Sequence, residues 1–145
     1  MTVLGRVSLG ALGLLLGAQA IGKLLDMGLY AVALDRFRAF PPRLTPAIAV
    51  AWVCVELVAC LGLAQAAVTA GSPRLIWRAG ATAALVDAVA YAVLTIGASV
   101  RGIEVFNCTC FGAFLPQRLS PFVLAQDIAM VAWTLWAVVG AVRAG

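Results

Sequence analysis

Residues 45–70 read TPAIAVAWVCVELVACLGLAQAAVTA, and Glu56 is the only charged residue among them. The run is longer than the roughly 20 apolar residues that a helix needs to cross a hydrocarbon core of about 30 Å. It opens with Thr45-Pro46, where a hydroxyl residue suited to a helix cap precedes a proline suited to the first helical position. We therefore expect a transmembrane helix over residues 46–70.

Three further apolar runs flank this one. Ser72-Pro73 and Ser120-Pro121 repeat the same cap signal before spans expected at about 73–99 and 121–142. The first run covers about 4–25. It has a small-x-small pattern near its end, but it stays apolar beyond that pattern, so we expect an uncleaved first span.

The composition agrees with a membrane protein. Of 145 residues, 64% are hydrophobic and 11% are charged, against roughly 45–50% and about 25% in soluble domains. We expect an all-α integral membrane protein, a single membrane domain built as an antiparallel four-transmembrane-helix bundle. In a membrane protein the net charge of +4 influences the orientation in the membrane and the contacts with anionic lipid headgroups. Nucleic-acid binding is excluded.

The sequence contains no histidine. Zinc sites with histidine ligands, haem with a histidine axial ligand and Ser-His or Cys-His catalysis are therefore excluded. The remaining reactive side chains are Cys, Asp, Glu, Lys, Arg and Tyr.

The first connection, residues 26–44, has a helical pattern of its own. Tyr30, Ala33, Leu34 and Phe37 are spaced i, i+3, i+4 and i+7, and prolines at 41 and 42 stop the helix. The pattern predicts an amphipathic helix lying at the membrane interface. The alternative is an extension of the first span into water.

The third connection, residues 101–119, contains Cys108-Thr109-Cys110 beside glycine and proline. Two thiols in a loop can form a labile disulfide or grip a soft ion, and either use requires the loop to present them at its surface. A redox pair is the favoured interpretation. The alternatives are a site for Cu(I) or Hg(II) and two small side chains that pack under the loop. No resident metal is expected.

Two more cysteines lie in the second span. Cys54 and Cys60 are about 240° apart around the helix, so they cannot bridge each other. Both are expected to be packing residues, although Cys60 shares a face with Glu56 and is a candidate relay.

Ionisable residues inside the spans predict a polar network. At 1.5 Å per residue, Asp127, Glu56 and Asp87 lie about 9, 15 and 20 Å below the face that carries the cysteine loop, and Lys23 lies close to that face. Burying such charges is costly unless they pair. We expect Glu56 and Asp87 to face the bundle interior, with at least one of them paired to Lys23 or to a polar side chain. The network is either a polar pocket or proton path that serves the thiols, or a structural link that holds the helices together.

Four short elements, taken in order, resemble the MauE proteins of methylamine utilisation, within the wider DoxX-like membrane proteins. They are Gly22-Lys23-Leu24, Arg36-Phe37, Glu56-Leu57 and Cys108-Thr109-Cys110-Phe111-Gly112. Where family members carry Arg-Asn or Arg-Asp early in the last span, this chain has Gln126-Asp127. The resemblance implies a four-helix membrane protein that partners extracytoplasmic thioredoxin-like proteins in disulfide or electron transfer.

The function expected from these observations is a membrane thiol–disulfide oxidoreductase or electron relay in which Cys108 and Cys110 exchange. One cysteine must be exposed, with Arg101, Arg118 or Lys23 available to lower its pKa. A quinone flanked by Phe106, Phe111 and Phe114 is the expected second electron acceptor. The rival classes are a soft-metal (Cu or Hg) binding or transport protein and a structural subunit of a membrane complex.

Two arguments on orientation in the plasma membrane conflict. Disulfide chemistry favours an extracytoplasmic cysteine loop and cytoplasmic termini. The rule that positive residues stay in the cytoplasm favours the opposite orientation, because six Lys or Arg residues lie on the side of the cysteine loop and four lie on the other side. We follow the chemistry and expect the loop outside.

Overall fold

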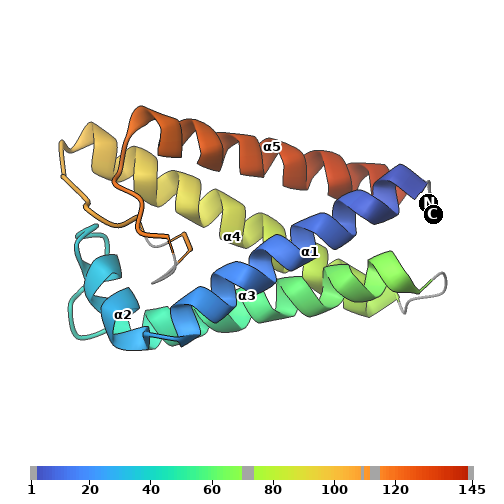
Figure 1. Ribbon diagram of the computed structural model, residues 1–145, viewed down its shortest axis with the longest axis horizontal. Coiled ribbons are helices and arrows are strands. Elements are labelled where there is room, and N and C mark those ends of the chain that lie inside the picture. The colour runs from blue at the N-terminus through green and yellow to red at the C-terminus, as the bar shows by residue number, and fades with distance from the viewer. Residues whose placement is uncertain (1–2, 70–73, 109, 112–114, 144–145) are drawn as a thin grey trace.

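The computed structural model describes residues 3–69, 74–108, 110–111 and 115–143, and they form an all-helical structure. The helices are α1 (Val3–Leu24), α2 (Met27–Asp35), α3 (Thr45–Val68), α4 (Arg74–Val100) and α5 (Pro121–Arg143). The four long helices coincide with the four predicted spans, and each is long and apolar enough to cross a membrane. In Figure 1 successive long helices run in opposite directions, so the start of α1 and the end of α5 lie at one end.

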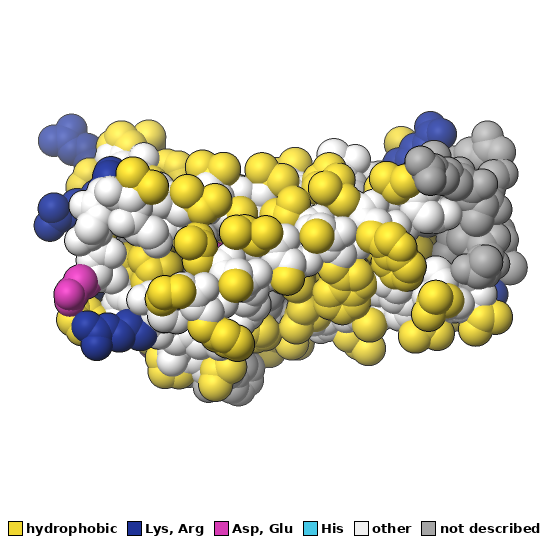
Figure 2. Space-filling model, turned by 90° about the horizontal axis from the view of Figure 1, so that it is seen from above, with side chains coloured by type: hydrophobic (Ala, Val, Ile, Leu, Met, Phe, Trp, Pro, Cys, Tyr) yellow, Lys and Arg dark blue, Asp and Glu magenta, His cyan; other side chains and the backbone are white. Residues whose placement is uncertain are grey.

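The outer surface of the bundle has the character of a lipid-facing surface. Large apolar side chains project from the middle of the spans, among them Leu14, Leu61 and Val93. Figure 2 shows hydrophobic side chains along the length of the molecule, with Lys and Arg gathered at its two ends. Water would disfavour this exposure, whereas the hydrocarbon core of a bilayer accommodates it.

Small residues set how closely the spans approach each other. The helices form a closed ring, in which α1 packs on α3, α3 on α4, α4 on α5 and α5 on α1. Gly62 of α3 and Gly80 of α4 meet backbone to backbone, since a Cβ built on Gly62 would lie 2.6 Å from the Gly80 Cα. Interfaces of this kind rely on van der Waals packing of small residues.

A separate helix forms in the first connection, so the alternative of an extended first span is wrong. α1 ends at Leu24, and the Asp26 carboxylate caps α2 by accepting from the Leu29 N–H at 2.8 Å. The predicted apolar face is buried against the bundle, although Phe37 lies beyond the end of the helix. Whether α2 lies in the membrane interface stays a prediction.

The three cap signals have different outcomes. Ser120 precedes α5 as predicted, and its hydroxyl lies 3.4 Å from the Val123 nitrogen. Thr45 is not the cap but the first residue of α3, and its hydroxyl donates to Asp35 instead, at 3.3 Å. Because Thr45 lies one position inside the helix, its hydroxyl faces the preceding connection, where the Asp35 carboxylate accepts its hydrogen bond. Ser72 lies outside the described residues.

The two connections at one end of the bundle are joined. The Arg101 guanidinium donates to the backbone carbonyls of Phe37 and Arg38, at 2.9 and 3.1 Å. Within the third connection, the Leu119 N–H donates to the Val105 carbonyl at 2.8 Å. These bonds hold the cysteine loop against the segment that follows α2.

Candidate functional site

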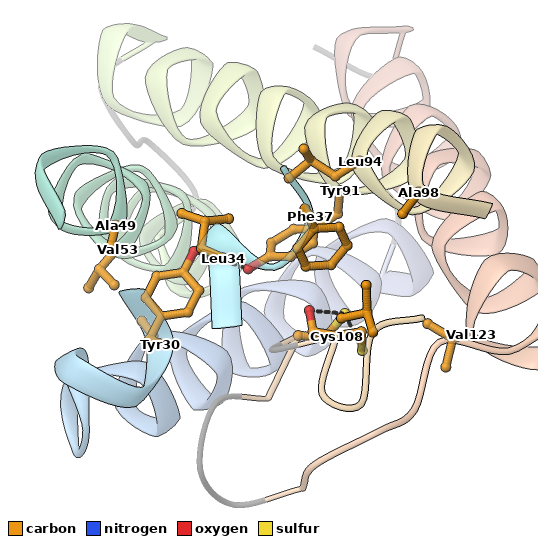
Figure 3. Close-up of a cluster of buried hydrophobic side chains, with 13 residues drawn as sticks. Tyr30, Leu34, Phe37, Ala49, Val53, Tyr91, Leu94, Ala98, Cys108 and Val123 are labelled. Atoms are coloured by element: carbon orange, nitrogen blue, oxygen red, sulfur yellow. Dashed lines mark hydrogen bonds between the residues drawn. The ribbon is translucent and has the colours of Figure 1, made fainter. Parts of the chain in front are cut away.

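The cysteine pair lies inside the end of the bundle. The Cys108 and Cys110 sulfurs are 3.3 Å apart, too far for a disulfide bond of about 2.05 Å, so both are thiols. The Cys108 N–H donates to the Gln117 carbonyl at 2.7 Å, which fixes the loop at this point. In Figure 3, Cys108 from the loop and Tyr91 from α4 belong to one apolar cluster with Leu34 and Phe37 from the α2 region.

The expectation that the loop presents the thiols at its surface is wrong. Cys108 is 1% exposed and Cys110 is 4% exposed. The loop carries apolar residues of its own, and Val105 packs into the same core cluster as Phe37 and Val123. Burying this apolar surface draws the cysteines inward with the rest of the loop.

The two thiols have different surroundings. The pKa of Cys108 is lowered, above all by its hydrogen bond with Cys110. The pKa of Cys110 is raised, first by that same hydrogen bond and then by burial. Cys108 is therefore the more acidic thiol of the pair.

The arginines expected to lower a thiol pKa have other partners. Arg101 donates to the backbone carbonyls described above, and Arg118 lies over the Phe106 ring and 3.5 Å from Glu104. The neighbouring thiol, rather than an arginine, is the main cause of the lowered pKa of Cys108.

A buried ion pair lies deeper in the bundle. The Lys23 ammonium of α1 pairs with the Glu56 carboxylate of α3, and both side chains are fully buried. The ammonium also lies 5.3 Å from the Tyr30 ring centroid and 4.7 Å from that of Tyr91. Two aromatic faces and one carboxylate thus compensate a cation that would otherwise be very costly to bury.

Asp87 of α4 is the second buried carboxylate, and it joins this ion pair to the region of the thiols. It accepts from the Trp52 indole N–H at 2.7 Å, and it lies within electrostatic reach of Glu56 and Lys23. Glu56 and Asp87 therefore face the bundle interior and have the kinds of partner that the sequence predicts.

Asp127 lies at the other side of the thiols, near the start of α5. Its Oδ1 atom is 3.9 Å from the Cys110 sulfur. A cavity of about 20 Å³, room for about one water molecule, lies between these groups and Asp87. Lys23, Glu56, Asp87 and Asp127 thus extend into the bundle near the cysteine pair, one from each of the four spans.

A family model described as methylamine utilisation protein MauE matches residues 1–140. The chain belongs to the MauE family. No curated protein and no solved structure matches it. The wider DoxX-like relationship stays a prediction.

The motif residues of this MauE-family protein come together in space. Lys23 and Glu56, which are 33 positions apart, form the buried ion pair. Phe37 and the two cysteines belong to one core cluster. Asp127, the second residue of the Gln126-Asp127 pair, reaches the Cys110 thiol.

The remaining predicted site residues lie away from the pair or outside the described part. Cys60 packs against Gly17 at the α1–α3 contact, and its relay role stays a prediction. Phe106 is 58% exposed, whereas Phe111 packs against the core. Phe114 lies outside the described residues.

Three residues of the network in this MauE-family protein, Tyr30, Trp52 and Gln19, were not predicted from the sequence. Two of them have a signal in the helical repeat: Trp52 is four residues before Glu56, and Gln19 is four residues before Lys23. Polar and aromatic residues one turn from an intramembrane charge mark the face that the charge occupies.

Proposed function

We propose that this MauE-family protein is a membrane thiol–disulfide oxidoreductase or electron relay that exchanges disulfides with an extracytoplasmic thioredoxin-like protein. The observation that carries the proposal is the unequal thiol pair. Two sulfurs at 3.3 Å need only a small approach to form a bond, and Cys108 is favoured as the thiolate.

Exchange with another protein requires access to Cys108. The loop end of the bundle has a recess of about 530 Å³, and the exposed side chains of Glu104 and Arg118 line it. We propose that the partner docks at this recess and that the loop opens to release Cys108. The half-buried Gln117, 3.9 Å from the Cys108 sulfur, is the side chain that must move.

The test is the redox state of the pair in membranes. In a Cys54→Ser/Cys60→Ser background, we expect a fraction of the protein to carry a disulfide that joins Cys108 to Cys110. Thiols are blocked in acid, the protein is reduced, and the newly freed thiols are counted by a mass-tagged maleimide. Either single serine variant of the pair should abolish the signal. If Cys108 and Cys110 stay fully reduced even after a small-molecule disulfide is added, the result contradicts the thiol–disulfide exchange function.

A quinone as the second electron acceptor also stays a proposal. Of the three phenylalanines assigned to it, Phe106 and Phe111 point to different surroundings, as described above. The exchange chemistry proposed here involves the two thiols and the partner disulfide alone.

The proposed orientation places the loop outside the cell. We expect Glu104→Cys, in a chain whose four native cysteines are serine, to react with a membrane-impermeant maleimide in intact cells, because this side chain is 73% exposed. Arg78→Cys, at an exposed site near the start of α4, is the control and should react only after lysis. The reverse pattern would overturn the orientation.

A further inference from the structure

Asp127 has a feature that the exchange reaction described so far does not use. The residue is 5% exposed, and its Oδ2 atom has no hydrogen-bond partner among the residues that the structure describes. A buried carboxylate oxygen without a partner is unfavourable and calls for a reason. The other oxygen of the same carboxylate lies 3.9 Å from the Cys110 sulfur.

The space around Asp127 suits the movement of a proton. The cavity of about 20 Å³ is lined by Cys110, Asp127, Asp87 and Tyr91, together with Gln19 and Gln126. One water molecule there would have several polar partners, which is what a buried water requires. Cys110, and not Cys108, lines this cavity.

We propose that Asp127 is a catalytic residue, the base that accepts the proton of Cys110 when Cys110 resolves a mixed disulfide formed at Cys108. This assignment rests on the proposed exchange function and adds the roles of the two cysteines. It is consistent with the burial of Cys110, which still raises the pKa of this thiol after Cys108 has entered the mixed disulfide, since a thiol that holds its proton needs a base to become a nucleophile.

The steps balance as follows. The Cys108 thiolate attacks the partner disulfide, one Cys108–partner S–S bond forms, the partner S–S bond breaks, and the electron pair leaves on the released partner sulfur. Cys110 gives its proton to Asp127 and attacks the Cys108 sulfur, so the Cys108–partner bond breaks and its electron pair leaves on the second partner sulfur. The cysteine pair is oxidised by two electrons and the partner is reduced by two. Asp127 passes its proton to water, and the two partner thiolates take up protons from water.

The experiment uses the full chain in lipid nanodiscs, with Cys54 and Cys60 replaced by serine, and the aromatic disulfide dithiobis(nitrobenzoate) as the probe. Attack by Cys108 releases one coloured thiolate, and closure by Cys110 releases a second. We expect Asp127→Asn to leave the first phase unchanged and to slow the second by about 10²-fold, in the range for loss of a general base. Asp127→Glu should restore most of the second-phase rate. Asp26→Asn, the same carboxylate-to-amide change at an exposed site in the first connection, is the matched control and should alter neither phase, because asparagine can cap α2 as aspartate does.

The pH profile separates a base from a structural residue. With Asp127 as the base, the wild-type second phase should reach a plateau with rising pH once Asp127 is ionised, whereas in Asp127→Asn it should keep rising about tenfold per pH unit, because hydroxide must remove the thiol proton. The titratable and charged groups facing Asp127 and Cys110 are Cys108, Asp87, Tyr91, Lys23 and Tyr30.

Each outcome decides a different claim. A wild-type protein that releases no second thiolate contradicts the exchange function itself. A wild-type second phase that rises tenfold per pH unit without reaching a plateau, or an Asp127→Asn second phase as fast as wild type, contradicts only the role of Asp127. The wild-type profile decides the question even if Asp127→Asn does not fold.

Discussion

Replacing Lys23 by methionine is expected to lower the free energy of unfolding by about 3–5 kcal/mol, because the substitution leaves the Glu56 carboxylate buried without its cation. Methionine keeps the length and the apolar stem of lysine, so the change removes charge with little loss of volume. The measurement is the free energy of unfolding in detergent micelles.

The matched control is the exposed pair between Arg118 and Glu104, whose side chains are 65% and 73% exposed. Arg118→Ala should cost at most about 1 kcal/mol, since exposed ion pairs contribute little. The double variant Lys23→Met/Glu56→Leu should recover most of the lost stability, because no buried charge is then left alone. If Lys23→Met lowered the free energy of unfolding by as little as Arg118→Ala, the result would contradict the burial of the Lys23–Glu56 ion pair.

Replacing Cys110 by serine is expected to accumulate a covalent adduct between this protein and a thioredoxin-like partner, in cells that supply the partner. Cys108 still attacks, but no resolving thiol remains to release the partner, so the mixed disulfide persists. We expect at least a tenfold enrichment of an adduct that disappears on reduction. The measurement is non-reducing electrophoresis of acid-trapped membranes followed by mass spectrometry of the captured protein.

Serine variants of the other three cysteines are the controls for this trapping experiment. Cys108→Ser should form no adduct, because the remaining thiol, Cys110, is buried at 4% exposure, and burial by itself raises its pKa. Cys54→Ser and Cys60→Ser should leave exchange largely intact. Loss of Cu(I) or Hg(II) binding in both single variants, without a protein adduct, would support the metal alternative. A Cys108→Ser/Cys110→Ser double variant that behaves like wild type would leave the cysteines as packing residues.

The four spans could be predicted from the sequence because a bilayer imposes a length and a polarity on any helix that crosses it. Residues 46–70 satisfy both requirements without reference to the rest of the chain. The pairing of Lys23 with Glu56 was foreseeable for a similar reason. A charge inside an apolar span must find a partner, and few partners exist in so apolar a chain.

The burial of the cysteines could not be predicted in the same way. It depends on Val105 and Phe37, which lie 68 positions apart and meet only when the connections at one end fold together. The contact of Asp127 with Cys110 likewise depends on where the loop returns to α5. Local patterns identify reactive residues, but long-range packing decides which of them touch.

The meeting of Gly62 and Gly80 has a geometric consequence for the whole molecule. The two helices are pinned together at a point without side chains, and Figure 1 shows them diverging from there toward the end that holds α2. The α3–α4 pair is therefore narrow at the two glycines and wider toward the end that holds α2, where Lys23, the buried carboxylates and the thiols lie. A bulkier residue at either glycine is expected to push the two helices apart, so two glycines that touch none of the reactive groups influence the spacing at which those groups meet.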